Sequence, residues 1–296
     1  MMKLYAPKYY SRFKCIADKC EHSCCVGWEI DIDSKSLAMY KGLEGGYGEA
    51  IKDSIAYDDT PHFRLGLHDR CPHLDERGLC KIITHLGEDY LCDICREHPR
   101  FYNYTDVAET GLGMSCPEAA RIILSSPDYM LLEEVGEVEG EPQDFAFDSL
   151  AERSHLYDLL ADSTADYKDR IKTICQYYSL DVPEDDDWLQ KLANIEYLDM
   201  AHKALFMRYS SQERSKGHDI YLERFLAYLI YRHTTEAPDR EDFVLRLRFC
   251  LGLAQLLASL MCHRGAKTLE DIALLAQIIS EEIEYSEDNT FTFIYE

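Results

Sequence analysis

The chain has 296 residues, a length that permits one large domain or two modest ones. Hydrophobic residues make up 46% of it, enough to build a buried core, which argues against disorder. With 31 basic and 55 acidic side chains the formal net charge is −24. This charge argues against nucleic acid and against membranes as partners, because both select Lys and Arg. A protein partner that carries lysines fits this negative charge better.

Charge and cysteine are unevenly distributed. Residues 1–120 carry 14 basic and 20 acidic side chains, whereas residues 121–296 carry 17 and 35. Nine of the 12 cysteines lie at or before Cys116. We therefore predict two domains: a cysteine-rich domain over 1–124 and an acidic α-helical domain over 125–296.

The N-terminal ten residues contain no apolar stretch of the kind found in secretory signals. The most apolar segment, 249–261, is interrupted by Gln255 and Ser259 and is shorter than the ~20 residues that span a bilayer. We therefore expect a cytoplasmic protein. Since disulfides are rare in that compartment, dense cysteine usage indicates metal or redox chemistry.

In chain order, 28–33 alternates apolar and acidic residues, which predicts a short half-buried strand or an extended piece. Residues 45–48 are glycine-rich and predict a loop. Pro117 opens a predicted helix over 117–124. The acidic segment 133–148, punctuated by glycine and proline, predicts a linker.

The remaining chain is predicted to be helical, and Thr268 with Asp271 forms a plausible capping box for the last helix. The fold class that follows is mostly α, with an irregular cysteine-rich metal-binding domain packed on an α-helical domain. The predicted helices cover about 149–162, 165–179, 185–210, 219–233, 240–263 and 268–285.

Three cysteine clusters, and one cysteine that follows them, are the candidate metal ligands. Close spacing lets short loops direct several sulfurs at one point, and thiolates suit soft centres such as zinc or iron–sulfur clusters. Three further cysteines lie in apolar helical patterns and are predicted to be core residues, and His73, His85 and His98 are left out of the ligand set. The candidate ligands are Cys15, Cys20, Cys24, Cys25, Cys71, Cys80, Cys92, Cys95 and Cys116.

Spacing alone leaves zinc and iron–sulfur open. Structural zinc sites usually show two paired Cys-x₂₋₄-Cys arms, whereas here the arms are unequal and Cys24 and Cys25 are adjacent. Nine thiols are more than the four ligands that one tetrahedral site needs. Some would bind one cluster while the rest bind no metal, or the nine would serve a cluster and a second metal. No Cys-x₃-Cys-x₂-Cys run is present.

At these residues the sequence resembles the flagellin lysine-N-methylase family, with a zinc- or iron-chelating cysteine-rich domain. The resemblance is dense over about 5–124 and thinner in the helical part. It is carried by Phe13-Lys14-Cys15-Ile16, Cys20-Glu21-x-x-Cys24-Cys25-x-Gly27-Trp28-x-Ile30-x-Ile32-Asp33, Cys71-Pro72-x-Leu74-Asp75-x-x-Gly78-x-Cys80, Cys92-Asp93-x-Cys95-Arg96-x-x-Pro99-Arg100 and Ser115-Cys116-Pro117-Glu118-Ala119-Ala120-Arg121.

The resemblance implies methyl transfer from S-adenosylmethionine to lysine ε-amines of flagellin or another lysine-bearing protein. It also implies an iron–sulfur cluster, with 4Fe-4S favoured and zinc as the alternative. The sequence shows no Gly-x-Gly-x-x-Gly fingerprint, since Gly111-Leu112-Gly113 is too short. The competing hypothesis is a non-enzymatic metal-binding module for structure, sensing or electron transfer.

For a methylase, the candidates for binding S-adenosylmethionine are Trp28, whose ring can face a cation, and Arg96 and Arg100, which can hold a carboxylate. The positive charges of the two arginines could equally balance the negative charge of an iron–sulfur cluster. Groups near the cysteines that could help a lysine lose its proton are Tyr90, Tyr102, Tyr104, Glu97 and Glu118.

Overall fold

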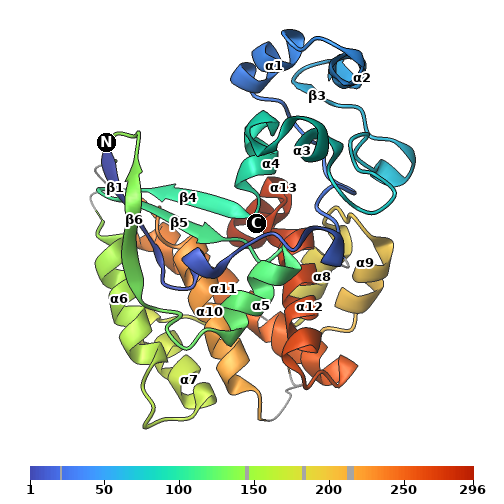
Figure 1. Cartoon of the computed structure of the whole chain (residues 1–296). Coiled ribbons are helices and arrows are strands. Elements are labelled where there is room, and N and C mark those ends of the chain that lie inside the picture. Colours follow the sequence, from blue (N-terminus) through green and yellow to red (C-terminus); the bar gives the residue numbers. More distant parts are fainter. Residues whose placement is uncertain (21, 144–146, 182–184, 212–216) are drawn as a thin grey trace. The chain divides into compact units, whose positions relative to one another are not determined.

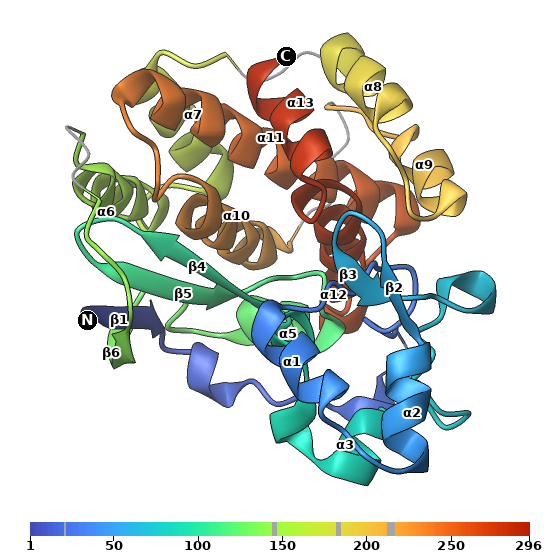
Figure 2. The ribbon, with the colours of Figure 1, turned by 90° about the horizontal axis from the view of Figure 1, so that it is seen from above.

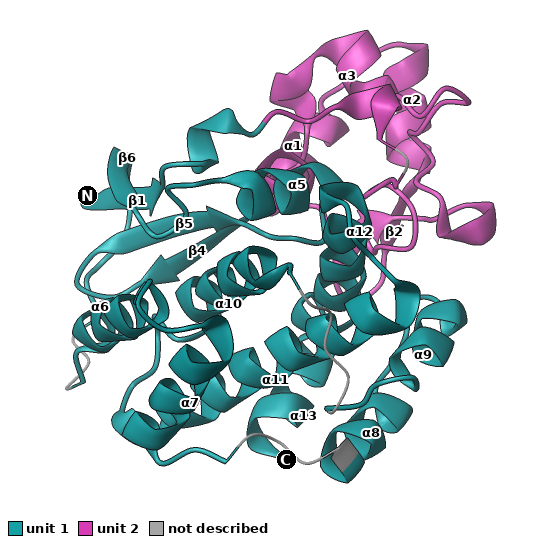
Figure 3. Ribbon diagram, turned by 90° about the horizontal axis from the view of Figure 1, so that it is seen from below, with its two compact units in different colours: residues 1–13, 100–296 teal, residues 14–99 magenta. Residues whose placement is uncertain are grey.

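The computed structural model describes residues 1–20, 22–143, 147–181, 185–211 and 217–296, so Glu21 of the cysteine motif lies outside the described residues. The chain forms two compact units, one of residues 14–99 and one of residues 1–13 with 100–296 (Figure 3). This division differs from the predicted boundary at 124. The reason is that the N-terminal strand and the strands within 100–112 form one sheet, and this sheet belongs to the same unit as the helices.

The larger unit contains a four-stranded sheet that was not predicted (Figure 1). Its strand order is β4-β5-β1-β6, with β1 parallel to β5 and antiparallel to β6. The strands are β1 (Met2–Pro7), β4 (Arg100–Tyr104), β5 (Ala108–Leu112) and β6 (Leu132–Val138).

Strand β6 occupies part of the predicted linker 133–148, so that prediction is wrong for 133–138. The strand is half-exposed at the edge of the sheet, and Lys3 pairs with Glu134 across it at 2.8 Å. Acidic side chains suit an exposed edge because they discourage pairing with another chain. Residues 144–146 of the predicted linker lie outside the described residues.

The helices of this unit confirm most of the predicted pattern, with three differences. The predicted helix 185–210 is two helices, and 268–285 ends in a π-helix at Ser280–Glu284. Helix α13 (Glu287–Tyr295) was not predicted. The others are α5 (Pro117–Ser125), α6 (Ser149–Leu160), α7 (Tyr167–Tyr178), α8 (Asp185–Asn194), α9 (Met200–Phe206), α10 (Asp219–His233), α11 (Arg240–Arg264) and α12 (Leu269–Ile279).

Helix α11 is the centre of the larger core. It is the one helix in the described part of the chain that is long and apolar enough to cross a membrane, and 72% of its most apolar window is buried inside the protein. Gly252 lets α8 approach it, since a Cβ there would lie 1.9 Å from the ring of Trp188. The apolar stretch of α11 is therefore accounted for by the core of this unit.

Helices α6 and α10 lie beside strands β4 and β5 (Figure 2), and a buried ion pair connects α6 to the sheet. Arg153 on α6 makes two bonds of 2.6 Å to Glu109 on β5 and a third of 2.7 Å to the Thr235 hydroxyl that follows α10. The side chains of Arg153 and Glu109 are 6% and 2% exposed. Because neither charge reaches water, this pair specifies how α6 and α10 cover one face of the sheet.

A second buried network surrounds the π-helix. Glu284 bonds to His233 Nε2 at 2.7 Å and to the Tyr228 hydroxyl at 3.1 Å, and it lies 3.5 Å from Arg232. Burial alone would raise the pKa of Glu284, but Arg232 and His233 hold it below the ordinary value. Burial lowers the pKa of His233 and outweighs the opposing effect of Glu284, while Arg232 and Arg246 lower it further. Near neutral pH these shifts favour a charged carboxylate and a neutral imidazole.

The smaller unit consists of short elements. Residues 28–33 form the predicted extended piece: Asp31 bridges His62, and Ile30 and Ile32 are buried. The loop predicted at 45–48 is wrong, because residues 46–48 form the first turn of α2. The elements are η2 (Ala17–Lys19), α1 (Ser34–Lys41), α2 (Gly46–Asp53), β2 (Ile55–Tyr57), β3 (Pro61–Phe63), η3 (Leu67–Asp69), α3 (Lys81–Leu86), η4 (Glu88–Tyr90) and α4 (Asp93–Glu97).

The smaller unit has its own hydrophobic core, to which cysteines contribute directly. Cys71 and Cys92 are buried in it, beside aliphatic and aromatic side chains such as Ile51 and Phe63. His73 is also buried, and both ring nitrogens have partners, the Tyr47 hydroxyl at 3.1 Å and the Ser54 hydroxyl at 2.9 Å. This supports leaving His73 out of the ligand set.

Candidate metal centre

Two of the candidate ligands are brought together by backbone pairing. Val26 bridges Arg70 in an antiparallel arrangement, and the amide of Cys71 donates to the carbonyl oxygen of Cys25 at 2.8 Å. Cys25 and Cys71 are thus neighbours although 45 positions separate them in the sequence.

The other ligands of the smaller unit lie at helix starts. Cys80 is the N-cap residue of α3, and Cys92 is the N-cap residue of α4, with Cys95 in its first turn. A helix start directs several backbone N–H groups toward the capping position, which favours a negatively charged sulfur there. The sequence places a cysteine at each of these two positions.

These five residues, Cys25, Cys71, Cys80, Cys92 and Cys95, form what we call the thiol cluster. Their sulfurs interact electrostatically: Cys25 acts on Cys71, Cys80 and Cys95, and Cys92 acts on the same three. All five belong to the core of the smaller unit or pack against it. A cluster of thiols in an apolar setting is the donor chemistry that zinc and iron–sulfur centres use.

The pKa values in the thiol cluster diverge for identifiable reasons. Hydrogen bonds with Cys24 and Ser23, and a smaller contribution from Arg70, outweigh burial and lower the pKa of Cys25 to about 7. Burial raises the pKa of Cys71 to about 12, and burial also raises that of Cys80. Near neutral pH the cluster therefore holds both charged and neutral sulfurs.

A hydrogen bond connects the two thiols at the start of α4. The Cys95 thiol donates a hydrogen bond to the sulfur of Cys92, which lowers the pKa of Cys92 and raises that of Cys95. Tyr40 and Tyr47 flank the cluster, and each has a pKa raised first by burial and then by nearby cysteines. Mutual repulsion between thiolates is what a bound cation would relieve.

Among the described residues, no three His, Cys, Asp or Glu side chains converge closely enough to hold a metal ion as they stand. The donor set nevertheless fits a soft metal, since the thiol cluster supplies five sulfurs, and the nearby His73 and His85 are engaged elsewhere. The predicted ligand set therefore stays a prediction.

The remaining candidate ligands lie outside the thiol cluster. Cys15 and Cys24 are exposed, and Cys20 follows η2 with its thiol directed to the carbonyl oxygen of His22. Cys116 belongs to the larger unit, where it is the N-cap residue of α5 and packs against that unit's core. Their part in a metal site also stays a prediction.

The cofactor candidates belong to different units. Arg96 donates to Asp93 at 2.6 Å and to the carbonyl oxygen of Leu91, so it stabilises the turn that presents the thiol pair. Arg100, on β4, lies 5.7 and 5.6 Å from the ring centres of Tyr10 and Phe13. Trp28 is half-buried in the smaller unit, near the bridge that positions Cys25.

Strand β4 gathers three of the predicted residues on one face. Phe101 packs against Tyr231 of α10, and the amide of Asn103 donates to the backbone there. Since side chains alternate along a strand, Arg100, Tyr102 and Tyr104 share the opposite face. This grouping was not evident from the sequence.

The candidates Glu118, Tyr90 and Glu97 lie on α5, η4 and α4, and the Glu118 carboxylate already has an ion-pair partner. Glu118 pairs with Arg121 one helical turn away at 2.6 Å. The carbonyl oxygen of Tyr90 accepts from the Tyr40 hydroxyl at 2.7 Å. Glu97 ends α4, half-buried.

No phosphate-binding loop is formed by Gly111 and Gly113. A Cβ at Gly111 would lie 2.4 Å from Phe101, and one at Gly113 would lie 2.1 Å from the Tyr285 hydroxyl. Both glycines are therefore needed for packing. Packing alone explains why glycine stands at these two positions, without a bound cofactor.

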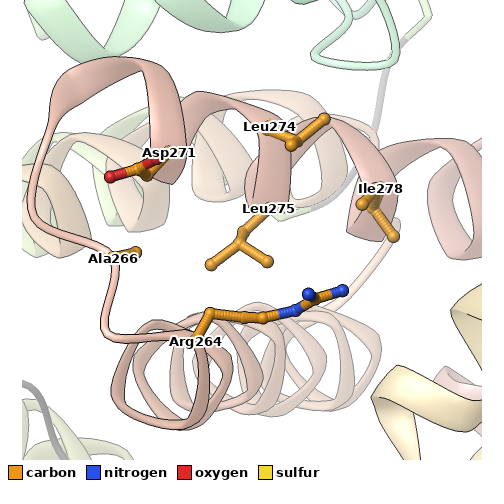
Figure 4. Close-up of a pocket in the computed structure, with 6 residues that line it drawn as sticks. All are labelled: Arg264, Ala266, Asp271, Leu274, Leu275 and Ile278. Atoms are coloured by element: carbon orange, nitrogen blue, oxygen red, sulfur yellow. The ribbon is translucent and has the colours of Figure 1, made fainter.

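A pocket of about 260 Å³ opens in the larger unit between the end of α11 and α12 (Figure 4). The Arg264 side chain extends along it, and aliphatic side chains such as Leu275 and Ile278 line it. Its acidic group, Asp271, already accepts the amides of Lys267 and Thr268. The volume is below the ~300 Å³ of the smallest usual ligand sites, so we do not assign S-adenosylmethionine to it.

The sequence is similar to curated Salmonella proteins. It is 30% identical over 139 residues to Lysine-N-methylase of Salmonella typhimurium, and 31% identical over 143 residues to that of Salmonella choleraesuis. The chain is thus similar over part of its length to two proteins named Lysine-N-methylase. The family resemblance predicted from the cysteine motifs is thereby confirmed.

The match to the lysine-N-methylases is partial: in each it covers 43% of this chain and 34% of the relative. The chain thus matches about a third of their length. The flagellar biosynthetic protein FliU of Salmonella muenchen is 29% identical over 162 residues, which cover 50% of this chain and 88% of FliU. No protein-family model and no solved structure matches.

Three residues around the thiol cluster were not predicted as part of the site. Arg70 acts on Cys25, and Tyr40 and Tyr47 flank the sulfurs. Arg70 directly precedes Cys71, a signal that could have been used. The tyrosines lie on α1 and α2, and only the fold brings them to the cysteines.

Proposed function

We propose that this chain is a protein-lysine N-methyltransferase that moves a methyl group from S-adenosylmethionine to the ε-amine of lysine, in flagellin or a similar protein. The observation that supports this most is the similarity to two proteins named Lysine-N-methylase. The flagellar name of a third relative supports a flagellar substrate. The net charge of −24 favours approach of a lysine-rich segment.

We further propose that the thiol cluster holds a metal centre, iron–sulfur by preference and zinc as the alternative. Cys25 and Cys92 would bind first, because their pKa values are lowered and thiolate is the ligating form. When bound, such a centre would supply positive charge that fixes the short elements of the smaller unit. Arg70 and Arg96 would stabilise the loops that carry the sulfurs.

Methyl transfer requires a neutral lysine amine in line with the sulfonium carbon. A lysine in water is protonated, so the site must take up a proton before the amine can attack. On the shared face of β4, Tyr102 and Tyr104 offer hydroxyls for this, and the Arg100 guanidinium can hold the carboxylate of the methionine portion. These roles follow from residue chemistry on one strand face.

The test uses anaerobically reconstituted protein with S-adenosylmethionine and purified flagellin, read by intact mass. Added methyl masses on flagellin support the proposal. Cys95→Ser should lose both the metal and the activity, whereas Cys262→Ser, an exposed cysteine of α11, should keep both. Absence of methylation by a metal-loaded, folded protein would contradict the proposed activity and favour a non-enzymatic metal-binding module.

The metal proposal has its own readout. A protein that binds iron and sulfide should be brown, with broad absorption at the blue end of the visible range. A colourless sample that contains zinc would replace iron–sulfur with zinc, and a sample with neither metal after reconstitution would contradict a metal centre. Each outcome is read without any activity measurement.

A further inference from the structure

The two edges of the four-stranded sheet differ in what meets their backbone. At the β4 edge, the Glu236 carboxylate accepts the backbone N–H of Tyr104 at 2.6 Å, and the Asn103 side chain donates to the backbone of α10. At the other edge lies β6, beside β1 in Figure 1, and no further described strand pairs with it. Among the described residues, the backbone of β6 has hydrogen-bond partners only in β1. The β6 edge is therefore open to an additional strand.

This open edge is strongly negative. Residues 131–143 contain five glutamates and no basic residue, and four of these glutamates are exposed. Lys3 of β1 forms an ion pair with Glu134 at 2.8 Å. Glu137 lies directly opposite Lys3 in the register, and among the described residues it has no ion-pair partner. The edge thus carries negative charge that the rest of its unit leaves uncompensated.

A β-bulge turns two of these glutamates to the same face of the sheet. Lys3 lies opposite Glu137, and Tyr5 lies opposite Glu134. The register shifts between Leu4 and Tyr5, where β6 has one extra residue. In a regular strand, positions three apart point to opposite faces. Because directly opposite residues share a face, the bulge places Glu134 and Glu137 together on the face of Lys3.

The Lys3–Glu134 pair shows which side chain this edge accepts from a neighbouring strand. A lysine on β1 reaches a β6 carboxylate with its ε-ammonium group at 2.8 Å. A strand added on the open side of β6 would lie one strand spacing away, ~4.8 Å, as β1 does. Its lysines can therefore reach Glu137 in the same way. A strand without lysine, including β6 of a second copy, would meet the glutamates without compensation, which disfavours its addition.

We propose that the open edge of β6 binds an extended, lysine-bearing segment of the protein substrate as an additional strand of the sheet. Backbone hydrogen bonds to β6 provide affinity, and Glu134 and Glu137 select lysines two positions apart in the segment. The identity of the substrate rests on the proposed function. Recognition of the segment is thereby assigned to the larger unit, whereas the thiol cluster belongs to the smaller one.

The binding test needs neither metal nor S-adenosylmethionine. The probe is a fluorescein-labelled peptide of alternating lysine and threonine, and fluorescence anisotropy measures its binding to the full chain. We expect saturable binding that weakens with salt, and Glu137→Lys should weaken it about fivefold, since an attraction becomes a repulsion. Asp158→Lys, at an exposed position of α6, changes the net charge equally and should leave the affinity nearly unchanged. Absence of binding, or equal weakening by both variants, would overturn the proposal.

Hydrogen exchange followed by mass spectrometry locates the contact. Backbone N–H groups on the open side of β6 should exchange rapidly in the free protein and slow down when the peptide adds as a strand. We expect this protection over residues 132–138 and unchanged exchange over 149–160 of α6. Unchanged exchange over 132–138 at saturating peptide would overturn strand addition, because a contact between side-chain charges alone leaves these N–H groups open.

Failure of this proposal and failure of the proposed function give different results. If both hold, Glu137→Lys should raise the KM for flagellin and leave kcat nearly unchanged, because the edge binds the substrate without taking part in the methyl transfer. Methylation with an unchanged KM would overturn docking at β6 and keep the activity. Peptide binding and protection at β6 without any methylation would support the docking edge and contradict the proposed activity.

Discussion

The buried ion pair between Arg153 and Glu109 gives the most quantitative prediction. Replacing Arg153 by Met removes three hydrogen bonds and leaves the Glu109 carboxylate 2% exposed without its cation. Breaking a buried pair from one side costs ~3–5 kcal/mol. For a unit of this size each kcal/mol lowers the melting temperature by ~2–4 °C, so we expect a loss of about 6–20 °C.

The assay is thermal unfolding followed by circular dichroism, with a double-mutant cycle. Arg153→Met with Glu109→Gln removes both charges, so the double variant should be at least ~2 kcal/mol more stable than the sum of the single losses predicts. Lys3→Met is the matched control, since the Lys3–Glu134 pair is exposed and its loss should leave the midpoint nearly unchanged. Additive losses in the cycle would refute the view that the buried charges depend on each other.

Three further predictions concern the larger unit. Thr268→Ala removes the capping box with Asp271 and should cost about 1 kcal/mol of unfolding free energy, measured by urea denaturation; no change would contradict the cap. Gly252→Ala forces a Cβ against Trp188 and should cost ~1–3 kcal/mol, although alanine favours helix; a gain in stability would show that the ring can move. The pKa of His233 is lowered from 6.5 in the folded protein, so on acidification the unfolded state binds this proton first, and the stability falls as the pH drops below about 6.5. His233→Gln should make the urea midpoint depend less on pH in this acidic range. An unchanged dependence of the midpoint on pH would contradict this.

The helices of the larger unit were predictable because their signals are local. The apolar spacing over 219–233 gave α10 with the bounds that the structure has, and the Thr268–Asp271 box marked the start of α12. The predicted helix 185–210 was too long because a run of helix-compatible residues continues through the break between α8 and α9. No residue in the turn between α8 and α9 gives a sequence signal that ends a helix.

The sheet could not be predicted from the sequence in the same way. Strand β1 pairs with residues more than 100 positions away, and one of its partners is β6, although the composition of β6 is typical of a linker. Such pairing is decided by tertiary contacts, which outweigh local preference. The domain boundary was misplaced for the same reason.

For the candidate site, spacing identified the residue types but not their grouping. Cys92 and Cys95 are close because they are near in sequence, whereas Cys25 meets Cys71 only through the Val26–Arg70 bridge. Arg96 was considered a cofactor ligand, and the structure shows it bonded to Asp93 and to backbone oxygens of its own turn. Sequence spacing cannot reveal such engagements.

The measurement that tests the central claim most directly is the transfer of a labelled methyl group. Metal-reconstituted protein is incubated with flagellin and S-adenosylmethionine that carries a trideuterated methyl group, and the flagellin peptides are sequenced by mass spectrometry. We predict the trideuteromethyl label on lysine ε-amines, and no label when S-adenosylmethionine is omitted. Unlabelled lysines after incubation with folded, metal-containing protein would contradict the account.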